Sequence, residues 1–435
     1  MIRTLKSYVQ SPADLTFLLG GLLVISMTFS PFLLSVAMWG LAAAALWQTA
    51  NDLRAEGRAA RAGNVLARIF SNFFRNTPLL FLSLLLLIPA ASFFWSEDHH
   101  FWLERVRVRI PFLVLPLIFS SLPVLSKLQY RRIVYLLLLT LFIISIGVGI
   151  NFALHAKTII DDLGHGRPVP VPRHHIRFNL MLATGILASG WLWLKKDPLF
   201  QRSWERGLLL GILLLLFAFI HLLSVRSGIA ALYLALLFTL ARFVLRTRQW
   251  KIALIALLFL LISPVAAYYA LPSLQERIAY MIWDWQQYQQ NAGDNYSDAE
   301  RWISLKVGLK MWTDNFWIGV GVGDLPSEIQ RLVSQMFPAY THDPRLPHNQ
   351  FIYILAGSGM LGLIGSLLAF AAPFFGGPHR RFYLFAVFQV MVFLSFMVEY
   401  TIETSIGVAW YLFYTLWFRK MALAELDPPP QASQH

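Results

Sequence analysis

The stretch DPRLPHNQFIYILAGSGMLGLIG, residues 343–365, places a titratable side chain, His348, at the start of an apolar segment. Asn349 follows it directly and Pro347 precedes it. Proline suits the first turn of a helix, where its missing N–H is not needed, so we expect a helix to begin here. Ionisable groups beside a membrane segment are costly and often functional. His348 is therefore a candidate functional residue, and Asn349 is expected either to orient it or to cap the helix.

A second candidate is Arg226, in the short turn SVRSGIA between two apolar segments. A turn this tight needs only small residues, yet it contains a large cation. Arginine binds phosphate oxygens through a planar fork of donors and stays charged at working pH, so Arg226 predicts an anionic ligand. Arg177 opens another apolar segment. Contacts with lipid headgroups explain the other unusually placed arginines equally well, namely Arg105, Arg107 and Arg109.

The elements that must position these residues are long apolar helices. Of the 435 residues, 57% are hydrophobic and only 14% are charged. Runs of about 18 apolar residues cross a hydrocarbon core roughly 30 Å thick. We predict an all-α polytopic membrane protein with twelve transmembrane helices, at about 13–29, 31–49, 77–95, 108–125, 132–152, 176–194, 207–224, 228–245, 251–270, 349–372, 382–399 and 404–418.

The charge distribution predicts how these spans are oriented. An even number places both termini on one side, which holds 22 of the 36 Lys and Arg and seven acidic residues. Basic loops remain cytoplasmic, so we expect both termini inside and the lipid bilayer, not nucleic acid, as the reason for the net charge of +13. The expected organisation is spans 1–9 within 1–270, a helical periplasmic loop or lid at 271–347, spans 10–12 within 348–420, and a cytoplasmic tail at 421–435.

Other candidate residues leave alternatives open. Glu399 and Glu403 flank the external ends of the last two spans and suit a second base, an arginine partner or an interface residue, with the arginine partner favoured. His221 precedes Arg226 by about a turn and a half and either lines the same cavity or is a packed histidine, which is favoured. The chain has no cysteine and no H-x-x-x-H or HExxH spacing, so we expect no metal. The run GVGVGD, residues 319–324, is expected to form a turn.

Three motifs in order resemble the O-antigen ligase family, which shares a superfamily with O-antigen polymerases and bacterial protein O-oligosaccharyltransferases. They are SVRSGIAALYLAL, DAERWISLKVGLKMWTDNFWIGVGVGDL and PHNQFIYILAGSGMLGLIG. With the twelve-span layout the resemblance covers about residues 170–415. It implies a GT-C-like, inverting glycosyltransferase that needs no metal or cofactor. The donor would be a polysaccharide on undecaprenyl pyrophosphate, and the acceptor a hydroxyl of lipid A–core at the periplasmic face of the inner membrane.

The resemblance also implies roles for individual residues. Arg226 and Arg301 would bind the donor pyrophosphate, with Arg177 as a weaker third, because fixed cations stabilise the charge of a leaving pyrophosphate. His348 would be the general base. We expect it to be neutral, because the N-terminus of a helix and neighbouring arginines disfavour the imidazolium. The supporting residues are expected to be Asn349, Glu399 and His221.

Three alternatives to a ligase remain. An O-antigen polymerase would use another lipid-linked repeat as acceptor, and a protein O-oligosaccharyltransferase would use Ser or Thr of a protein. A lipid-linked oligosaccharide transporter belongs to a different class. It is disfavoured because the predicted spans carry no Lys or Arg at mid-membrane, where transporters often place ionisable groups. The sequence leaves the oligomeric state open.

Overall fold

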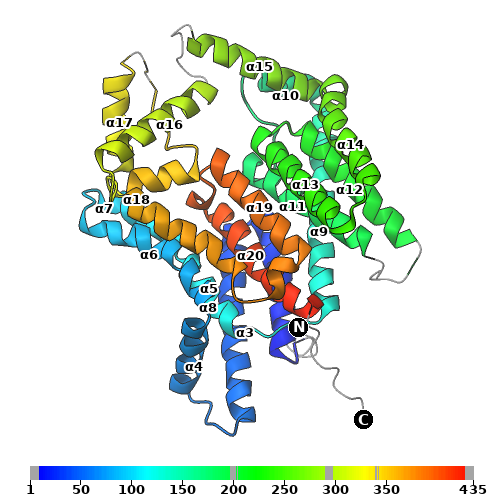
Figure 1. The fold of residues 1–435 in the computed structure, drawn as a ribbon, viewed down its shortest axis with the longest axis vertical. Helices are drawn as coiled ribbons and strands as arrows, with labels where there is room; N and C mark the ends of the chain where they lie inside the picture. The colour runs from blue at the N-terminus through cyan, green and yellow to red at the C-terminus, as the bar shows by residue number, and fades with distance from the viewer. Residues whose placement is uncertain are drawn as a thin grey trace.

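The computed structural model describes residues 9–195, 202, 204–289, 297–338, 340 and 342–426, and every regular element within these ranges is a helix. Figure 1 shows them as a tall bundle with shorter helices across one end. Eight segments are long and apolar enough to cross a membrane: α2 (Pro12–Phe29), α3 (Pro31–Ala55), α5 (Thr77–Leu82) with α6 (Leu84–Ala91) and η1 (Ser92–Phe94), α9 (Lys127–Leu154), α12 (Trp204–Leu222), α13 (Arg226–Thr247), α14 (Trp250–Ala270), and α18 (Gln350–Ala371) with η2 (Ala372–Phe374).

The other four predicted spans are helices that do not meet the same criterion of length and apolar character. They are α8 (Pro111–Ser121), α11 (His175–Leu194), α19 (Tyr383–Val398) and α20 (Ser405–Leu426). Two of them, α8 and α19, are short. Most of α11 and α20 is buried by neighbouring helices, and a helix shielded from lipid can carry polar groups that face the bundle interior. The structure therefore confirms a helical membrane protein, while the number twelve stays a prediction.

The centre of the bundle is α20, which packs against α8, α11 and α19. Its aromatic side chains Trp410 and Trp417 are fully buried. Trp410 Nε1 donates a hydrogen bond of 3.0 Å to Thr184 Oγ1 on α11. Gly20 on α2 lies directly against Trp417, where a Cβ would approach the indole to 2.6 Å. Large rings on α20 and small residues on its neighbours thus interdigitate to form the core.

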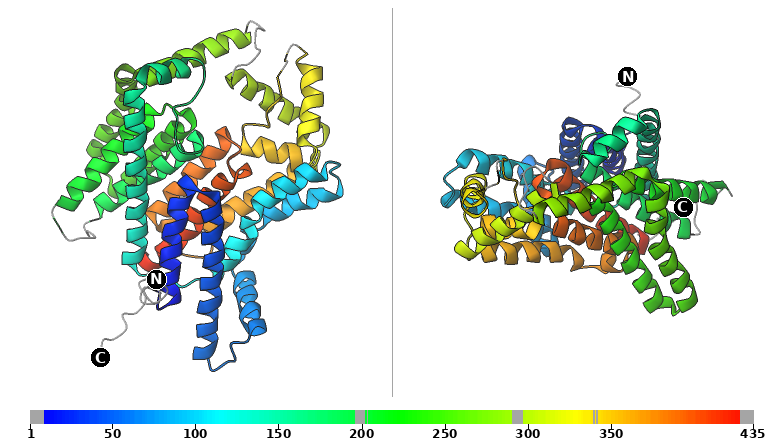
Figure 2. Two further views of the ribbon diagram at one scale, coloured as in Figure 1. Left: turned by 180° about the vertical axis from the view of Figure 1, so that it is seen from behind. Right: turned by 90° about the horizontal axis from the view of Figure 1, so that it is seen from above.

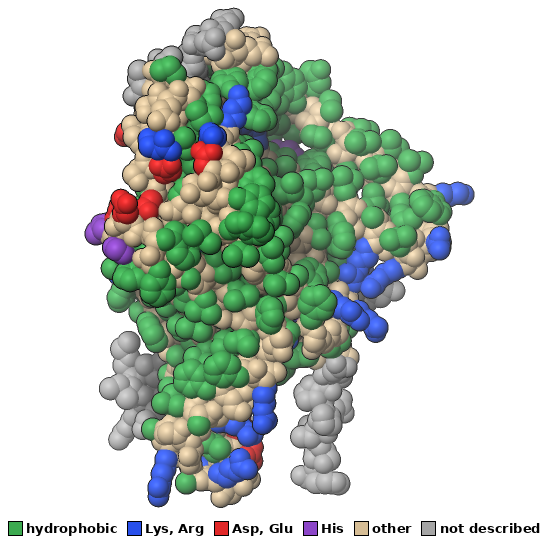
Figure 3. Space-filling view, turned by 60° about the vertical axis from the view of Figure 1, so that its left-hand side comes forward, with side chains coloured by type: hydrophobic (Ala, Val, Ile, Leu, Met, Phe, Trp, Pro, Cys, Tyr) green, Lys and Arg blue, Asp and Glu red, His purple; other side chains and the backbone are tan. Residues whose placement is uncertain are grey.

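Shorter helices gather at one end of the bundle, and α4 (Ala62–Arg75) lies at the other (Figures 1 and 2). Figure 3 shows a broad hydrophobic surface with many Lys and Arg side chains toward the lower end. The end with the short helices contains the described part of the predicted 271–347 region, which is helical as expected. These helices are α7 (His99–Arg109), α10 (Ala156–Gly164), α15 (Pro272–Gln289), α16 (Ser297–Asp314) and α17 (Leu325–Met336).

The helix that follows His348, α18, is kinked at Gly359, and the glycine-rich segment at residues 319–324 packs against this kink. Gly359, within α18, has a φ of 65°. Backbone hydrogen bonds join the segment to the kink, with Val320 N donating to Ala356 O at 2.9 Å and Met360 N to Phe316 O at 2.9 Å. A Cβ at Gly359 would lie 2.3 Å from the carbonyl carbon of Trp317. The run at 319–324 therefore forms a turn that fixes the α16–α17 region against α18.

Candidate active site

His348 lies in the extended segment immediately before α18. Asn349 is the N-cap of this helix: its Oδ1 accepts hydrogen bonds from Phe351 N at 2.9 Å and Ile352 N at 3.1 Å. Its Nδ2 donates to Met397 O at the end of α19, at 2.7 Å. Of the two roles expected for Asn349, the structure shows the cap. Because this cap also ties α18 to α19, it fixes the backbone on which His348 stands.

The helix α16 packs closely over this segment. Gly308 makes the approach possible, because a Cβ there would lie 2.7 Å from Ile352 and 2.9 Å from Pro347. Ser304 Oγ, one turn earlier on α16, accepts a hydrogen bond of 3.4 Å from His348 N. The segment RWISLKVGLKMW, residues 301–312, thus supplies a small residue at this contact, and Arg301 at its start lies on the same side as His348.

The imidazole of His348 lies between a carboxylate and an aromatic ring. Its Nδ1 is 3.4 Å from Oε2 of Glu399, and its ring centroid is 5.0 Å from that of Tyr400 in an edge-to-face arrangement. The residue is 8% exposed. Neither ring nitrogen has a hydrogen-bond partner in the described part of the chain. His348 is therefore held in place by packing beside Glu399, and its buried Nε2 has no hydrogen-bond partner within the described residues.

Glu399 joins His348 to an arginine. Its Oε1 accepts from Arg301 Nη2 at 3.1 Å, while its Oε2 faces His348. Burial raises the pKa of Glu399, but the contact with His348 and the charges of Arg301 and Arg177 outweigh burial, so its pKa lies below the ordinary value. Glu399 is therefore a carboxylate at neutral pH. It is the arginine partner favoured from the sequence, and it faces the candidate base as well.

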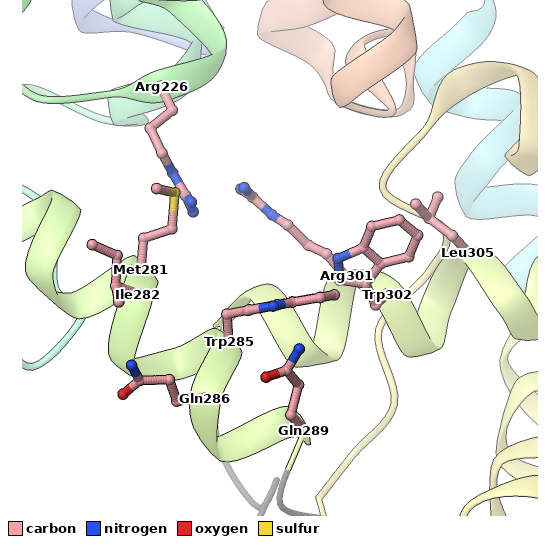
Figure 4. Close-up of a pocket in the computed structure, with 9 residues that line it drawn as sticks. All are labelled: Arg226, Met281, Ile282, Trp285, Gln286, Gln289, Arg301, Trp302 and Leu305. Carbon is pink, nitrogen blue, oxygen red and sulfur yellow. The ribbon is translucent and has the colours of Figure 1, made fainter.

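Arg301 and Arg226 share a cavity of about 670 Å³ formed by α13, α15 and α16. In Figure 4 the two guanidinium groups extend toward the same open space from opposite walls. Trp285 and Trp302 line the cavity, with ring centroids 6.1 Å apart. A smaller adjoining recess is lined by both arginines and also by Arg277. None of the residues lining the larger cavity, all of which are described, is acidic. The cavity therefore concentrates positive charge beside aromatic surface.

Arg177 is placed differently from the prediction. Its Nε donates to Thr404 Oγ1 and its Nη2 to Tyr400 O, both at 3.3 Å, and the residue is buried. It lines neither of the two cavities that contain Arg226 and Arg301. The reason is that α11 enters the bundle beside the 399–404 segment, so the guanidinium donates its hydrogen bonds to acceptors of that segment. Its placement supports a positioning role for Arg177, not direct donor binding.

His221 is also not in the cavity. Its Nδ1 lies 2.7 Å from Phe217 O, one turn back on α12, and its Nε2 lies 2.9 Å from Tyr233 Oη on α13. These contacts use both ring nitrogens and join two helices. The packed, hydrogen-bonded histidine favoured from the sequence is what the structure has.

A second carboxylate in the same segment, that of Glu403, forms its contacts outside the candidate site. Glu403 pairs with Arg109 of α7 and accepts a hydrogen bond of 2.7 Å from Gln350 Nε2. Gln350 Oε1 in turn accepts from Ile402 N at 3.0 Å. All of these side chains are buried. Glu403 is thus an arginine partner, as favoured, and Arg109 is a buried structural cation rather than a contact for headgroups. The η4 turn (Thr401–Glu403) is fixed to the start of α18.

Arg277, near the site, was not expected from the sequence, which left the roles of His174 and His175 open. Arg277, on α15, donates to Gly166 O at 2.9 Å and lines the recess with Arg226. His174 and His175 stack with ring centroids 5.1 Å apart. Burial and the charge of Arg177 lower the pKa of His174. The only available signal for Arg277 was its position in the amphipathic SLQERIAYMIWDWQQY segment, which does not show which face meets Arg226.

Comparison with known proteins gives a match to a protein family. Residues 210–367 match a family model described as O-antigen ligase. The matched range contains Arg226, Arg301 and His348, whereas Arg177 and Glu399 lie outside it. No curated protein matches the chain. The match places the chain in the superfamily of O-antigen ligases and polymerases, and with the apolar helices it indicates a multi-pass membrane protein of a glycosyl-transferring type. The chain thus carries an O-antigen ligase family domain at residues 210–367.

Proposed function

We propose that the protein transfers O-antigen polysaccharide from undecaprenyl pyrophosphate to a hydroxyl of lipid A–core at the periplasmic face of the inner membrane. One observation carries this proposal. Arg301 lines the cationic cavity with Arg226 and is joined by Glu399 to the otherwise unpartnered imidazole of His348. A site for a leaving anion and a site for proton transfer are therefore adjacent, as glycosyl transfer from a pyrophosphate requires.

The arginines would bind the leaving group. When the anomeric C–O bond breaks, its electron pair departs with the pyrophosphate, whose negative charge increases. Arg226 and Arg301 are positioned to stabilise that charge, and their planar donor groups match phosphate oxygens. Arg277, in the adjoining recess, would add a third cation. Arg177 would act indirectly by holding the 399–404 segment.

His348 would act as the general base. The acceptor oxygen forms the new bond to the anomeric carbon from the face opposite the pyrophosphate, and Nε2 of His348 takes the hydroxyl proton. Glu399, facing Nδ1, would hold the proton on that nitrogen and so leave the lone pair of Nε2 free. It would also stabilise the imidazolium that forms.

The test is transfer by the purified protein in proteoliposomes. The donor is undecaprenyl pyrophosphate that carries a defined polysaccharide. The acceptor is either lipid A–core or a second lipid-linked repeat. We expect product only with lipid A–core. Product only with the lipid-linked repeat would make the protein a polymerase, and labelling of protein Ser or Thr would make it a protein glycosyltransferase. Transmembrane movement of intact donor without any transfer would favour the transporter.

A further inference from the structure

A large cavity lies at the far end of α18 from His348. It is enclosed by α4, α5, η2 and the final part of α20, and its volume is about 840 Å³. Its polar wall includes Asn72, Asn76, Arg75 and Arg419. All of its lining residues lie in the described ranges, and none is Asp or Glu. Two cations without a lining carboxylate indicate that the cavity suits an anion.

The two arginines differ in how their donors are used. Arg419 Nη2 donates to Asn76 Oδ1 at 3.3 Å, but its Nη1 is buried and has no hydrogen-bond partner within the described residues. Gly376, with a φ of 81°, lies beside this guanidinium, and a Cβ there would be in ordinary contact with Nη2 at 3.9 Å. Arg75 is exposed at the end of α4. A buried donor without an acceptor is costly unless a ligand or water satisfies it.

The remaining wall is apolar and continues onto an exposed apolar surface. Phe81 lines the cavity, as do Leu368 and Phe375, which are 50% and 63% exposed. On the adjacent helix α4, Phe70 and Phe74 are exposed and stack with centroids 6.5 Å apart. A free phosphate has no apolar part that could contact this surface, whereas a phospholipid carries two acyl chains beside its anionic headgroup.

We propose that this cavity binds one anionic phospholipid, with the headgroup phosphate between Arg75 and Arg419 and the acyl chains along Phe81, Leu368 and Phe375. The binding site is separate from the proposed transfer site and does not depend on it. It lies among the basic residues of the predicted cytoplasmic side, where anionic lipids attract cationic groups of a membrane protein. The lipid would fill the space between α4 and the end of α18.

The test is native mass spectrometry of the full chain released from nanodiscs of phosphatidylcholine containing a few per cent phosphatidylglycerol. We expect one phosphatidylglycerol to stay bound after mild delipidation. Arg75→Gln should weaken its retention about fivefold, the factor for one arginine near an anionic surface. The Arg75→Gln/Arg419→Gln double variant should weaken it further. Arg75 is exposed, so its variant is expected to fold even if the double variant does not.

Arg132→Gln is the matched control, because Arg132 is an exposed cation near the start of α9 on the same predicted side. It should retain the lipid as the wild type does. Three results would overturn the proposal. Arg75→Gln would retain phosphatidylglycerol as the wild type does, or Arg132→Gln would lose as much of it as Arg75→Gln does. In the third, the wild type would retain phosphatidylcholine as well as it retains phosphatidylglycerol. Displacement by glycerol 1-phosphate at the same concentration as the lipid would also overturn it, because it would identify a site for free phosphate.

Discussion

At the scale of single residues, the charge of Glu399 connects the two halves of the candidate site. Its two oxygens face different partners, Arg301 and His348. The pKa of Glu399 is lowered by these contacts despite burial, so the carboxylate charge is present whenever the enzyme works near neutral pH. Removing this charge while keeping the side-chain shape separates its electrostatic role from its packing.

Glu399→Gln should reduce kcat of transfer about 100-fold, in the range found when a carboxylate that orients a functional histidine is lost. Glu104→Gln, at an exposed carboxylate of α7, should leave kcat unchanged. A wild-type kcat for Glu399→Gln would exclude its coupling to the base.

The same lowered pKa predicts a pH-dependent stability. A carboxyl group whose pKa is lower in the folded state stabilises that state above its unfolded pKa, here near the ordinary value of 4.5. This contribution falls as the pH drops through the folded pKa. The Tm difference between wild type and Glu399→Gln, measured by thermal unfolding in detergent, should therefore be constant above about pH 5 and shrink below pH 4.5. A difference that grew on acidification would contradict this assignment.

Arg226→Gln should raise the KM for the donor about tenfold, because one charge-assisted contact to phosphate is lost. Arg226→Lys should recover only part of the loss, since a lysine lacks the planar fork. Donor titrations of the reconstituted protein measure both. Arg331→Gln removes an exposed cation of α17 on the same predicted side and should leave KM unchanged. An unaltered donor KM in Arg226→Gln would remove Arg226 from the donor site.

At this scale the sequence singled out His348, Arg226 and Arg301 as candidates, because each stands in a short motif with a local chemical reason, and their roles stay predictions. It favoured an arginine as the partner of Glu399 but did not identify which one. Arg301 lies on α16 and Glu399 directly after α19, and no periodicity links such distant positions. For the same reason the sequence did not predict the contacts of Arg177, because its surroundings depend on where the 399–404 segment packs.

At the scale of elements, the bent α18 is the part that positions the site. The bend at Gly359 receives the backbone of the 316–321 segment, and the start of the same helix carries His348. The apolar run after Phe351 predicted the helix correctly. It did not predict the bend, because the bend depends on backbone contacts between distant segments that leave no side-chain pattern except glycines.

Gly359→Ala should lower the stability of the protein by about 1–3 kcal/mol from the left-handed backbone alone, with more from the clash against Trp317. It should also reduce transfer, because the segment that fixes α16 would shift. Thermal unfolding and the transfer assay measure these effects. Gly149→Ala on α9 is the control, since a Cβ there meets no atom within 4 Å. Equal stability of the two variants would show that the bend tolerates a side chain.

At the scale of the whole molecule, the proposed periplasmic reaction requires that the end with α15, α16 and α17 lies outside the cytoplasm. The apolar runs located the helices, because length and composition are local properties. They did not fix the number of spans, since α11 and α20 are buried among other helices and need not be uniformly apolar. Orientation depends on charge asymmetry alone and is open to direct measurement.

Because the chain has no cysteine, single substitutions report orientation directly. Gln330→Cys, at an exposed position of α17, should react with a membrane-impermeant maleimide in intact spheroplasts. Ala59→Cys, in the exposed turn between α3 and α4, should react only after the membrane is permeabilised. The reverse pattern would place the candidate site in the cytoplasm and exclude the proposed periplasmic reaction.

The role of His348 as general base is tested most directly by the rate of glycan transfer by purified His348→Ala, measured together with donor binding. We expect transfer to fall at least 100-fold, as for loss of a general base, while the donor still binds through Arg226 and Arg301. His100→Ala, which removes an exposed histidine of α7, should transfer at the wild-type rate. Transfer by His348→Ala at the wild-type rate would show that this imidazole is not the base.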